Sequence, residues 1–377
     1  MASTTRSTSS STSTSRRHGR RNRARCRRAT SRDVVAHRAR EHASTTIVTH
    51  VNERATTTTA EAWYDVARAR KANASTNDIG ELANEGKGTK IYVIPGNPGC
   101  AKYYDAFARE LFEAFDGTRD VDVVGYVGHA ALASPSTANA RMWFTLDEQH
   151  AHVEAYIARD RARREQEGGG KICADCAVGH SIGARVALRA RYALGAENID
   201  VVVGLMPFLH VNTKSAKQRA LSFLTRLTLV VHVVGALMDA LRVAAPRVRA
   251  LVVASVTRGM DAAARDITDS WLQWRTLINM AFMGRTEFAA LVHSVDTCAL
   301  VANASKRCAL VYALDDHWAP LHQHDALKNI SKSKLDIDVS IVRDPSVSHD
   351  FVVRDASAKL MAKRAATLIR EREAASA

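Results

Sequence analysis

The sequence predicts an α/β fold in which a mostly parallel sheet carries helices on both faces and is interrupted by a helical insertion. Two features lead to this prediction. Short apolar runs alternate with segments of helical periodicity along most of the 377-residue chain, which is the pattern of a parallel sheet built from βα units. One of these runs also leads into Gly179-His180-Ser181-Ile182-Gly183, where a strand is expected to turn sharply into a helix.

The elements before this serine follow the alternation. Thr46–Val51 is expected to form a first strand, and a polar, mixed stretch follows it to about residue 84. The spacing of apolar residues predicts helices over Tyr103–Phe115 and Thr145–Arg164, the second with a capping box made by Thr145 and Glu148. The strands expected around these helices are Ile91–Ile94, Val121–Val127 and Ile172–Ala177.

The alternation continues after the serine and resumes near the C-terminus. Val186–Leu194 continues the helix behind Ser181, and Ile199–Met206 gives another apolar strand. Two late strands are expected at Cys308–Leu314 and Leu335–Val342, the second half exposed because apolar and polar residues alternate along it. A closing helix is expected at 351–370.

Residues from about 208 to 294 break this rhythm and predict a helical insertion over the carboxyl edge of the sheet. The most apolar run, Leu227–Met238, has twelve residues, whereas a helix needs about twenty to span a bilayer. Two compatible interpretations stay open. The run could be a lid helix packed over the sheet, or it could lie in a lipid interface with Arg242, Arg247 and Arg249 facing head groups.

The positive charge is concentrated at the N-terminus. Of the formal net charge of +14, residues 1–45 carry +10, from twelve arginines against Asp33 and Glu41. The rest of the chain is nearly balanced, which argues against nucleic acid as a partner. The Ser- and Arg-rich, acid-poor composition is typical of a disordered basic arm or of an organelle transit peptide. We therefore expect such an arm at 1–45 and one folded domain, containing the insertion, at 46–377.

The cysteine and histidine patterns predict neither a metal site nor a cofactor. The six cysteines form no dense framework, which favours a reducing compartment. Cys173 and Cys176 have the spacing of a redox or zinc pair, but no second pair completes a metal site, and packing in the strand before Ser181 is the favoured interpretation. A polar loop with His317 and His324 lacks the spacing of an open metal site.

Ser181 is the candidate nucleophile. The glycines on both sides are needed because a Cβ would clash across so tight a turn. A serine also argues against an epoxide hydrolase or a dehalogenase, since these enzymes need a carboxylate nucleophile. His180, directly before the serine, is expected to be structural or solvated.

The other catalytic parts follow in the order Ser, Asp, His that serine hydrolases on a parallel sheet use. The strand Cys308–Leu314 leads into Asp315 and Asp316, which are the candidate acids. His349 follows the last strand and is the candidate base, which would take the proton of Ser181 and return it to the leaving group. This order predicts an α/β-hydrolase fold.

The loop after Ile94 is expected to complete an oxyanion hole. Backbone N–H groups near Gly96 and Asn97 would join that of Ile182. Pro98 cannot contribute because it has no N–H.

These motifs resemble the lipid droplet-associated hydrolase family of the α/β-hydrolase superfamily. The stretch 94–99, followed by two tyrosines, is similar to the entry motif of that family, and 179–184 is similar to its elbow. Residues 316–320 resemble its Asp-x-Trp-x-Pro acid loop, which favours Asp316 over Asp315. The resemblance covers about residues 88–370.

The histidine segment, His349–Val352, is similar to that of the family but departs from it at one position. Asp350 replaces a small residue expected beside the histidine, and a carboxylate there could alter the pKa of the base.

The resemblance implies a serine carboxylic-ester hydrolase with Ser181, Asp316 and His349 as catalytic residues. It implies cleavage of esters of apolar lipids, sterol esters or acylglycerols, through an acyl-enzyme at the surface of lipid droplets or of the endoplasmic reticulum. Two alternatives stay open: a weakly active or non-catalytic droplet-organising protein, and an acyltransferase that uses the same serine. The basic arm is not part of the resemblance and leaves a plastid or mitochondrion as the alternative location.

Overall fold

The computed structural model describes residues 40–51, 54–65, 89–131, 143–292 and 295–375. Residues 1–39, most of the segment expected to be a basic arm or a transit peptide, lie outside these ranges. The boundary expected at residue 45 therefore stays a prediction.

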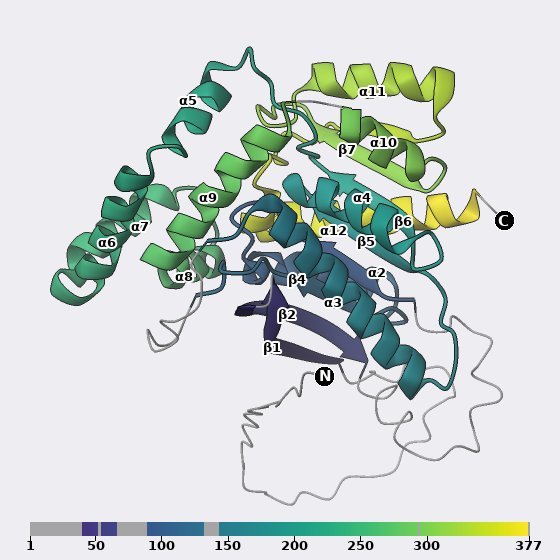
Figure 1. Ribbon diagram of the computed structural model, residues 1–377, viewed down its shortest axis with the longest axis horizontal. Helices are drawn as coiled ribbons and strands as arrows, with labels where there is room; N and C mark the ends of the chain where they lie inside the picture. The colour runs from purple at the N-terminus through teal and green to yellow at the C-terminus, as the bar shows by residue number, and fades with distance from the viewer. Residues whose placement is uncertain (1–39, 52–53, 66–88, 132–142, 293–294, 376–377) are drawn as a thin grey trace, which may run out of the picture. The chain divides into compact units, whose positions relative to one another are not determined.

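Six parallel strands make up most of the sheet (Figure 1). They adjoin in the order β4-β3-β5-β6-β7-β8, and every neighbouring pair in this series is parallel. Their carboxyl ends therefore meet at one edge, where ligands and catalytic residues of such sheets are found. The strands are β3 (Ile91–Ile94), β4 (Val121–Val124), β5 (Asp175–His180), β6 (Ile199–Leu205), β7 (Cys308–Ala313) and β8 (Asp338–Val342).

Two antiparallel strands extend the sheet beside β4. β1 (Arg40–Val51) pairs with β2 (Arg54–Asp65), and β2 pairs antiparallel with β4. The first strand thus begins at Arg40 rather than Thr46, and the stretch expected to be polar and mixed contains a second strand. Its sequence is rich in threonine, which favours strands, but it lacks the alternation of apolar residues that would have revealed it.

Helices cover both faces of the sheet, and each face has its own apolar cluster. Side chains alternate between the two: Ile91 and Val93 of β3 belong to one cluster, Tyr92 and Ile94 to the other. A strand buried on both faces is apolar throughout, and for this reason β3 could be predicted from sequence. The first face carries η2 (Ala101–Tyr104), α2 (Asp105–Ala114), η3 (Phe351–Val353) and α12 (Asp355–Ala374); the second carries α3 (Leu146–Glu167), α4 (Ile182–Leu194), α10 (Val295–Asn303) and α11 (Leu321–Lys334).

The structure confirms the capping box expected at the start of α3 but only one of the two cysteines expected inside β5. The capping box is confirmed: the Thr145 hydroxyl accepts from the Glu148 backbone N–H at 3.2 Å, and the Glu148 carboxylate accepts from the Thr145 N–H at 2.8 Å. Cys176 is buried in β5 as expected, but Cys173 precedes the strand and is exposed. The expectation that both cysteines pack inside the strand was therefore wrong for Cys173, because the strand begins only at Asp175.

The expected insertion consists of five helices. In Figure 1, α9 lies between α6 and the sheet, while α6 and α7 form the outer part of the insertion. Gly235 of α6 allows the close approach of α9, since a Cβ there would lie 2.6 Å from the ring of Trp274. The helices are α5 (Ala216–Leu224), α6 (Thr228–Ala244), α7 (Pro246–Val256), α8 (Ala262–Trp271) and α9 (Trp274–Ala290).

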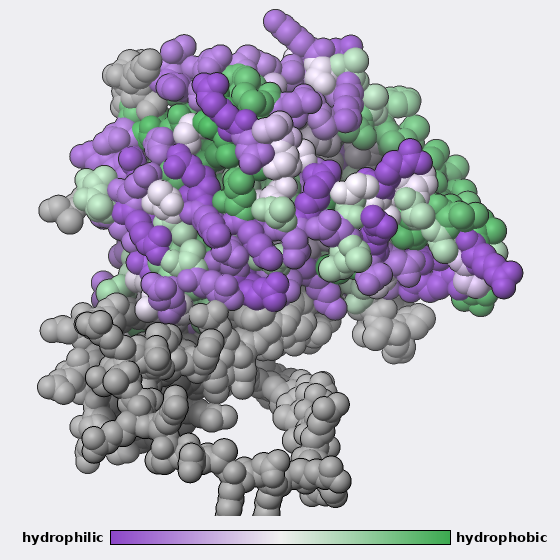
Figure 2. Space-filling model, turned by 180° about the vertical axis from the view of Figure 1, so that it is seen from behind, coloured by the Kyte–Doolittle hydropathy of each residue, from purple (hydrophilic) through white to green (hydrophobic). Residues whose placement is uncertain are grey.

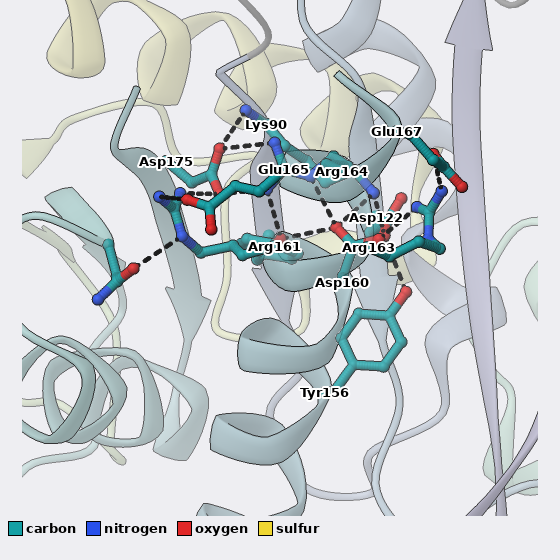
Figure 3. Close-up of polar contacts among 12 residues, drawn as sticks. Lys90, Asp122, Tyr156, Asp160, Arg161, Arg163, Arg164, Glu165, Glu167 and Asp175 are labelled. Carbon is teal, nitrogen blue, oxygen red and sulfur yellow. Dashed lines mark hydrogen bonds and ion pairs between the residues drawn. The ribbon is translucent and has the colours of Figure 1, made fainter. Parts of the chain in front are cut away.

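A buried ion network joins α3 to the sheet at the edge opposite Ser181 (Figure 3). Asp175, the first residue of β5, is fully buried and accepts hydrogen bonds from the Lys90 backbone N–H at 2.7 Å and from Arg161 at 2.6 Å. The Lys90 ammonium group pairs with Asp122 of β4 at 2.7 Å and with Asp160 of α3 at 3.0 Å. Buried charges persist only when they are paired, so these contacts fix where β3, β4 and β5 begin relative to α3.

Asp175→Asn tests this network. The variant is expected to lower the free energy of unfolding by about 3 kcal/mol, because the buried Arg161 loses the nearest of its carboxylate partners. Urea denaturation measures the change. In the matched control, Glu167→Gln, the altered side chain is 62% exposed, and the change should stay below about 0.5 kcal/mol. Equal midpoints of urea denaturation for the two variants would contradict the role assigned to Asp175.

Candidate active site

Ser181 lies at a strained turn between β5 and α4. Its φ of 55° and ψ of −124° place a non-glycine residue in a sparsely populated backbone region. The predicted need for flanking glycines is confirmed by the distances. A Cβ on Gly179 would lie 2.2 Å from the carbonyl oxygen of Gly183, and a Cβ on Gly183 would lie 2.2 Å from that of Ile94. The turn therefore packs directly on the carboxyl end of β3.

The structure brings the three residues predicted to be catalytic into one hydrogen-bonded chain. The Nδ1 atom of His349 lies 2.7 Å from Oδ2 of Asp316, and its Nε2 atom lies 2.9 Å from Oγ of Ser181. An ionised carboxylate can only accept, so Nδ1 carries the proton and Nε2 accepts from the serine hydroxyl. Asp316 follows β7 and His349 follows β8, as the sequence indicated.

The loop after β7 explains why Asp316, and not Asp315, faces the histidine. Asp315 is exposed, whereas the Asp316 side chain is fully buried and its Oδ1 accepts from the N–H groups of Trp318 at 2.8 Å and Ala319 at 3.1 Å. Burial alone would raise the pKa of Asp316, but the bonds from His349 and from these two N–H groups hold that pKa below its usual value. Asp316 is thus ionised at neutral pH.

A second hydrogen-bonded chain, which the sequence did not reveal, runs behind Ser181. Nε2 of His180 lies 2.8 Å from the carbonyl oxygen of His349, which can only accept, so Nε2 is the donor. Nδ1 then accepts from the Tyr104 hydroxyl at 2.6 Å, and the oxygen of that hydroxyl accepts from the Gly96 N–H at 2.8 Å. Burial lowers the pKa of His180 to about 3, which keeps this ring neutral. His180 is structural, and it connects the histidine loop to the loop after β3.

The loop after β3 contacts the serine. A Cβ on Gly96 would lie 2.9 Å from Cβ of Ser181. Because the Gly96 N–H is bonded to Tyr104, the Asn97 and Ile182 N–H groups are the candidates for an oxyanion hole. The loop is also held on the β4 side, where the Tyr126 N–H donates to the Gly99 carbonyl at 3.0 Å.

Asp350 belongs to a separate set of contacts. Its carboxylate accepts from the Ser348 hydroxyl and pairs with Arg354 at 3.3 Å. Asp350, which departs from the family motif, therefore contacts Ser348 in its own loop and Arg354, the residue before α12.

Within the described ranges, no group of three His, Cys, Asp or Glu side chains is placed to hold a metal ion. His324 is buried and bonds to Asp325 at 2.9 Å, whereas His317 is exposed.

Comparison with known proteins gives the family. The family model described as "Lipid-droplet associated hydrolase" matches residues 87–352. The chain belongs to this family. Proteins named lipid droplet-associated hydrolase match it at 23% identity from Dictyostelium discoideum (256 residues, 64% of this chain and 76% of that protein) and from Rattus norvegicus (248 residues, 63% and 73%).

Solved structures show that the fold is the α/β-hydrolase fold. Haloalkane dehalogenase DbeA from Bradyrhizobium elkani matches with a TM-score of 0.58 at 10% identity, covering 88% of this chain and 100% of its own. The peroxisomal α/β-hydrolase Lpx1 from Saccharomyces cerevisiae matches with a TM-score of 0.54 at 12% identity, covering 90% of each chain. At these identities the likeness concerns the fold alone.

The hydrogen bonds of Tyr104 to Gly96 and His180 lead to a prediction for any reaction at Ser181. Tyr104→Phe leaves the Gly96 N–H and Nδ1 of His180 without their bridge, so the loop that contacts Ser181 loosens. Because an unsatisfied buried polar group costs about 1–3 kcal/mol, kcat is expected to fall about tenfold to hundredfold. Steady-state hydrolysis of a short soluble ester measures the effect.

Tyr103→Phe is the matched control. The Tyr103 hydroxyl is also buried, but it bonds to Thr268 of α8 at 2.7 Å and not to the loop beside Ser181. Its loss should lower stability while kcat is retained. An equal fall of kcat in the two variants would refute the positioning role of Tyr104.

Proposed function

We propose that this chain is a serine carboxylic-ester hydrolase that cleaves esters of apolar lipids, sterol esters or acylglycerols, at the surface of lipid droplets. The observation that carries the proposal is the chain Asp316–His349–Ser181, with distances of 2.7 and 2.9 Å, in a member of a hydrolase family. Both relatives are named for lipid droplets, which supports the droplet as the place of action. A plastid or mitochondrial location through residues 1–45 stays the alternative.

In the first half of the proposed reaction, Oγ of Ser181 attacks the ester carbonyl and its proton passes to Nε2 of His349. The tetrahedral oxyanion accepts hydrogen bonds from the N–H groups of Asn97 and Ile182. The C–O bond to the alcohol then breaks, His349 donates its proton to the departing alcohol oxygen, and the acyl group remains on Ser181. The buried, ionised Asp316 stabilises the imidazolium that forms in between.

In the second half, His349 takes a proton from water while the water oxygen attacks the acyl-enzyme. The same two N–H groups hold the oxyanion, and the acid leaves as Ser181 regains its proton from His349. If an alcohol replaces the water, the product is a new ester, so an acyltransferase would use the same residues.

The outer helices of the insertion support an apolar partner. Figure 2 shows a hydrophobic surface at the end of the molecule that these helices form. On α6, Gly235 and Met238 are buried against the rest of the insertion, whereas Leu229 is 74% exposed, so the run packs along one side and leaves its other side uncovered. Its large exposed apolar residues, with those of α5 and α7, are Phe223, Leu224, Leu229, Val230, Val233, Val234, Leu237, Val243, Val248, Leu251, Val252 and Val256.

The charges on this surface favour anionic head groups. Residues 216–256 contain six lysines and arginines against one acid, Asp239. Arg242 and Arg247 are exposed, as expected for head-group contacts, but Arg249 is buried and pairs with Asp269 of α8. Apolar area with flanking cations is the composition of helices that lie in a lipid interface.

Among the described residues, no single helix has both the length and the apolarity needed to cross a membrane. Taken together, α5 and α6 are long and apolar enough, but the two helices are bent by 76° where they meet.

Ser181→Ala tests the proposed chemistry. A fluorophosphonate probe should label the wild-type chain and leave the variant unlabelled, and release of fatty acid from cholesteryl oleate or triolein should fall at least a thousandfold. His349→Ala should lose labelling as well, because no base remains to take the serine proton. A wild-type chain that takes up no probe would refute the hydrolase and leave a droplet-organising role. Formation of a new ester from an added alcohol would identify acyl transfer.

The apolar surface is tested by placing charge on α6. Leu229→Asp combined with Leu237→Asp should lower binding to triolein droplets coated with phosphatidylcholine and phosphatidylserine at least tenfold, since two exposed apolar anchors are lost. Flotation of the droplets measures binding, and hydrolysis of a short soluble ester should be unchanged. Ile330→Asp on α11 is the control, because Ile330 is also exposed (38%) but lies outside this surface. Equal binding of the double variant and the control would refute the surface.

A further inference from the structure

We infer that Glu287 of α9 is a positioning residue, which holds the side chain of Asn97 and thereby fixes the loop beside Ser181. The inference rests on the proposed function, because it assigns a role to a contact with the candidate oxyanion hole. No part of the sequence motif around Ser181 contains Glu287, which lies within the insertion.

One face of α9 is shaped to receive the Asn97 amide. Nδ2 of Asn97 donates to the Glu287 carboxyl group at 3.1 Å and to the Met280 carbonyl oxygen at 3.0 Å. Residues 280, 284 and 287 lie on the same side of a helix. Gly284 lies between the two acceptors, and the amide packs on it at contact distance, since a Cβ there would lie 3.5 Å from Nδ2. Both hydrogen atoms of the amide nitrogen are thus directed at α9.

This contact acts on the part of the loop where the position of the backbone matters. Asn97 directly follows Gly96, whose N–H is held by Tyr104 and whose Cα approaches Ser181. The loop is therefore held from the sheet side through Tyr104 and from the insertion through Glu287. A shift of the Asn97 side chain would move its own N–H away from the place where the oxyanion develops, and donors in such sites must be placed within a few tenths of an ångström.

Glu287 is expected to be uncharged where it contacts the loop beside Ser181. The side chain is buried, and among the described residues its hydrogen-bond partner is the Asn97 amide and not a cation. Burial raises the pKa of Glu287 to about 8, although the bond from Asn97 lowers it. At neutral pH the carboxyl group is therefore uncharged, so it accepts from Asn97 without placing a negative charge next to a developing oxyanion.

Among the described residues, no cation influences Glu287, since its pKa responds only to burial and to the bond from Asn97. Tyr126, in the loop after β4, is the titratable group influenced by Glu287, and burial and Glu287 both keep its pKa well above the usual value. From α6, His232 and Asp239 lie against Trp274 at the far end of α9. α5 and α3 contact this helix near Thr225 and Leu146, which are uncharged. Ionisation of Glu287 would thus leave an unpaired buried charge.

Kinetics of p-nitrophenyl butyrate hydrolysis between pH 6 and 9.5 test the inference. Glu287→Ala should lower kcat about tenfold to hundredfold with KM within twofold, because the loop acts on the transition state. Glu287→Gln keeps an acceptor and should restore kcat at pH 7 to within about threefold of the wild type. Wild-type kcat should fall as pH rises through about 8, because Glu287 becomes charged, and the Gln variant should lack this alkaline decline.

Arg285→Gln, on the exposed side of the same helix, is the matched control and should leave kcat and the pH profile unchanged. Equal kcat for Glu287→Ala and this control, or an alkaline decline in Glu287→Gln that matches the wild type, would overturn the inference. Because the Gln variant is isosteric, its pH profile decides the matter even if the Ala variant fails to fold. A wild-type chain that neither hydrolyses the ester nor takes up a fluorophosphonate would instead refute the proposed function, and this inference with it.

Discussion

The contact between the Ser181 turn and the carboxyl end of β3 is the constraint on which the rest of the site depends. Gly183 approaches the carbonyl oxygens of Ile94 and Pro95 so closely that a Cβ would lie 2.2 and 2.4 Å from them. Gly96 approaches Ser181 in the same way. The strained backbone of the serine and the loop after β3 therefore hold each other in place, and the loop cannot shift without disturbing the turn.

The other contacts of the site extend outward from this point. His180 and Tyr104 join the loop to the carbonyl group of His349, so the base and the loop are positioned by one set of hydrogen bonds. On the opposite side, Glu287 and Met280 join the loop to α9. Because α9 also packs against α6, the exposed apolar helices and the loop beside Ser181 are mechanically connected.

The sequence predicted those parts of the molecule that depend on local chemistry. β3 is recognisable because both of its faces are buried, the elbow because only glycine fits around Ser181, and the acid and the base because they follow late strands in the required order. The residues that were missed act through long-range packing. Nothing near Tyr104, His180 or Glu287 in the sequence indicates that they meet the same loop, and β2 has too little apolar alternation to be recognised. Asp315 and Asp316 could be distinguished only by a resemblance, until the backbone N–H groups of Trp318 and Ala319 showed which carboxylate is held.

Trapping the acyl-enzyme and locating its acyl group tests the proposed reaction most directly. The full chain would be mixed with p-nitrophenyl palmitate, quenched in acid within the first turnover, digested and mapped by mass spectrometry. Addition of one palmitoyl group to the peptide that contains Ser181, together with a burst of p-nitrophenol of about one equivalent per chain, is the expected result. Release of p-nitrophenol with no adduct on Ser181, or with the adduct on another residue, would contradict the assignment of Ser181 as the nucleophile.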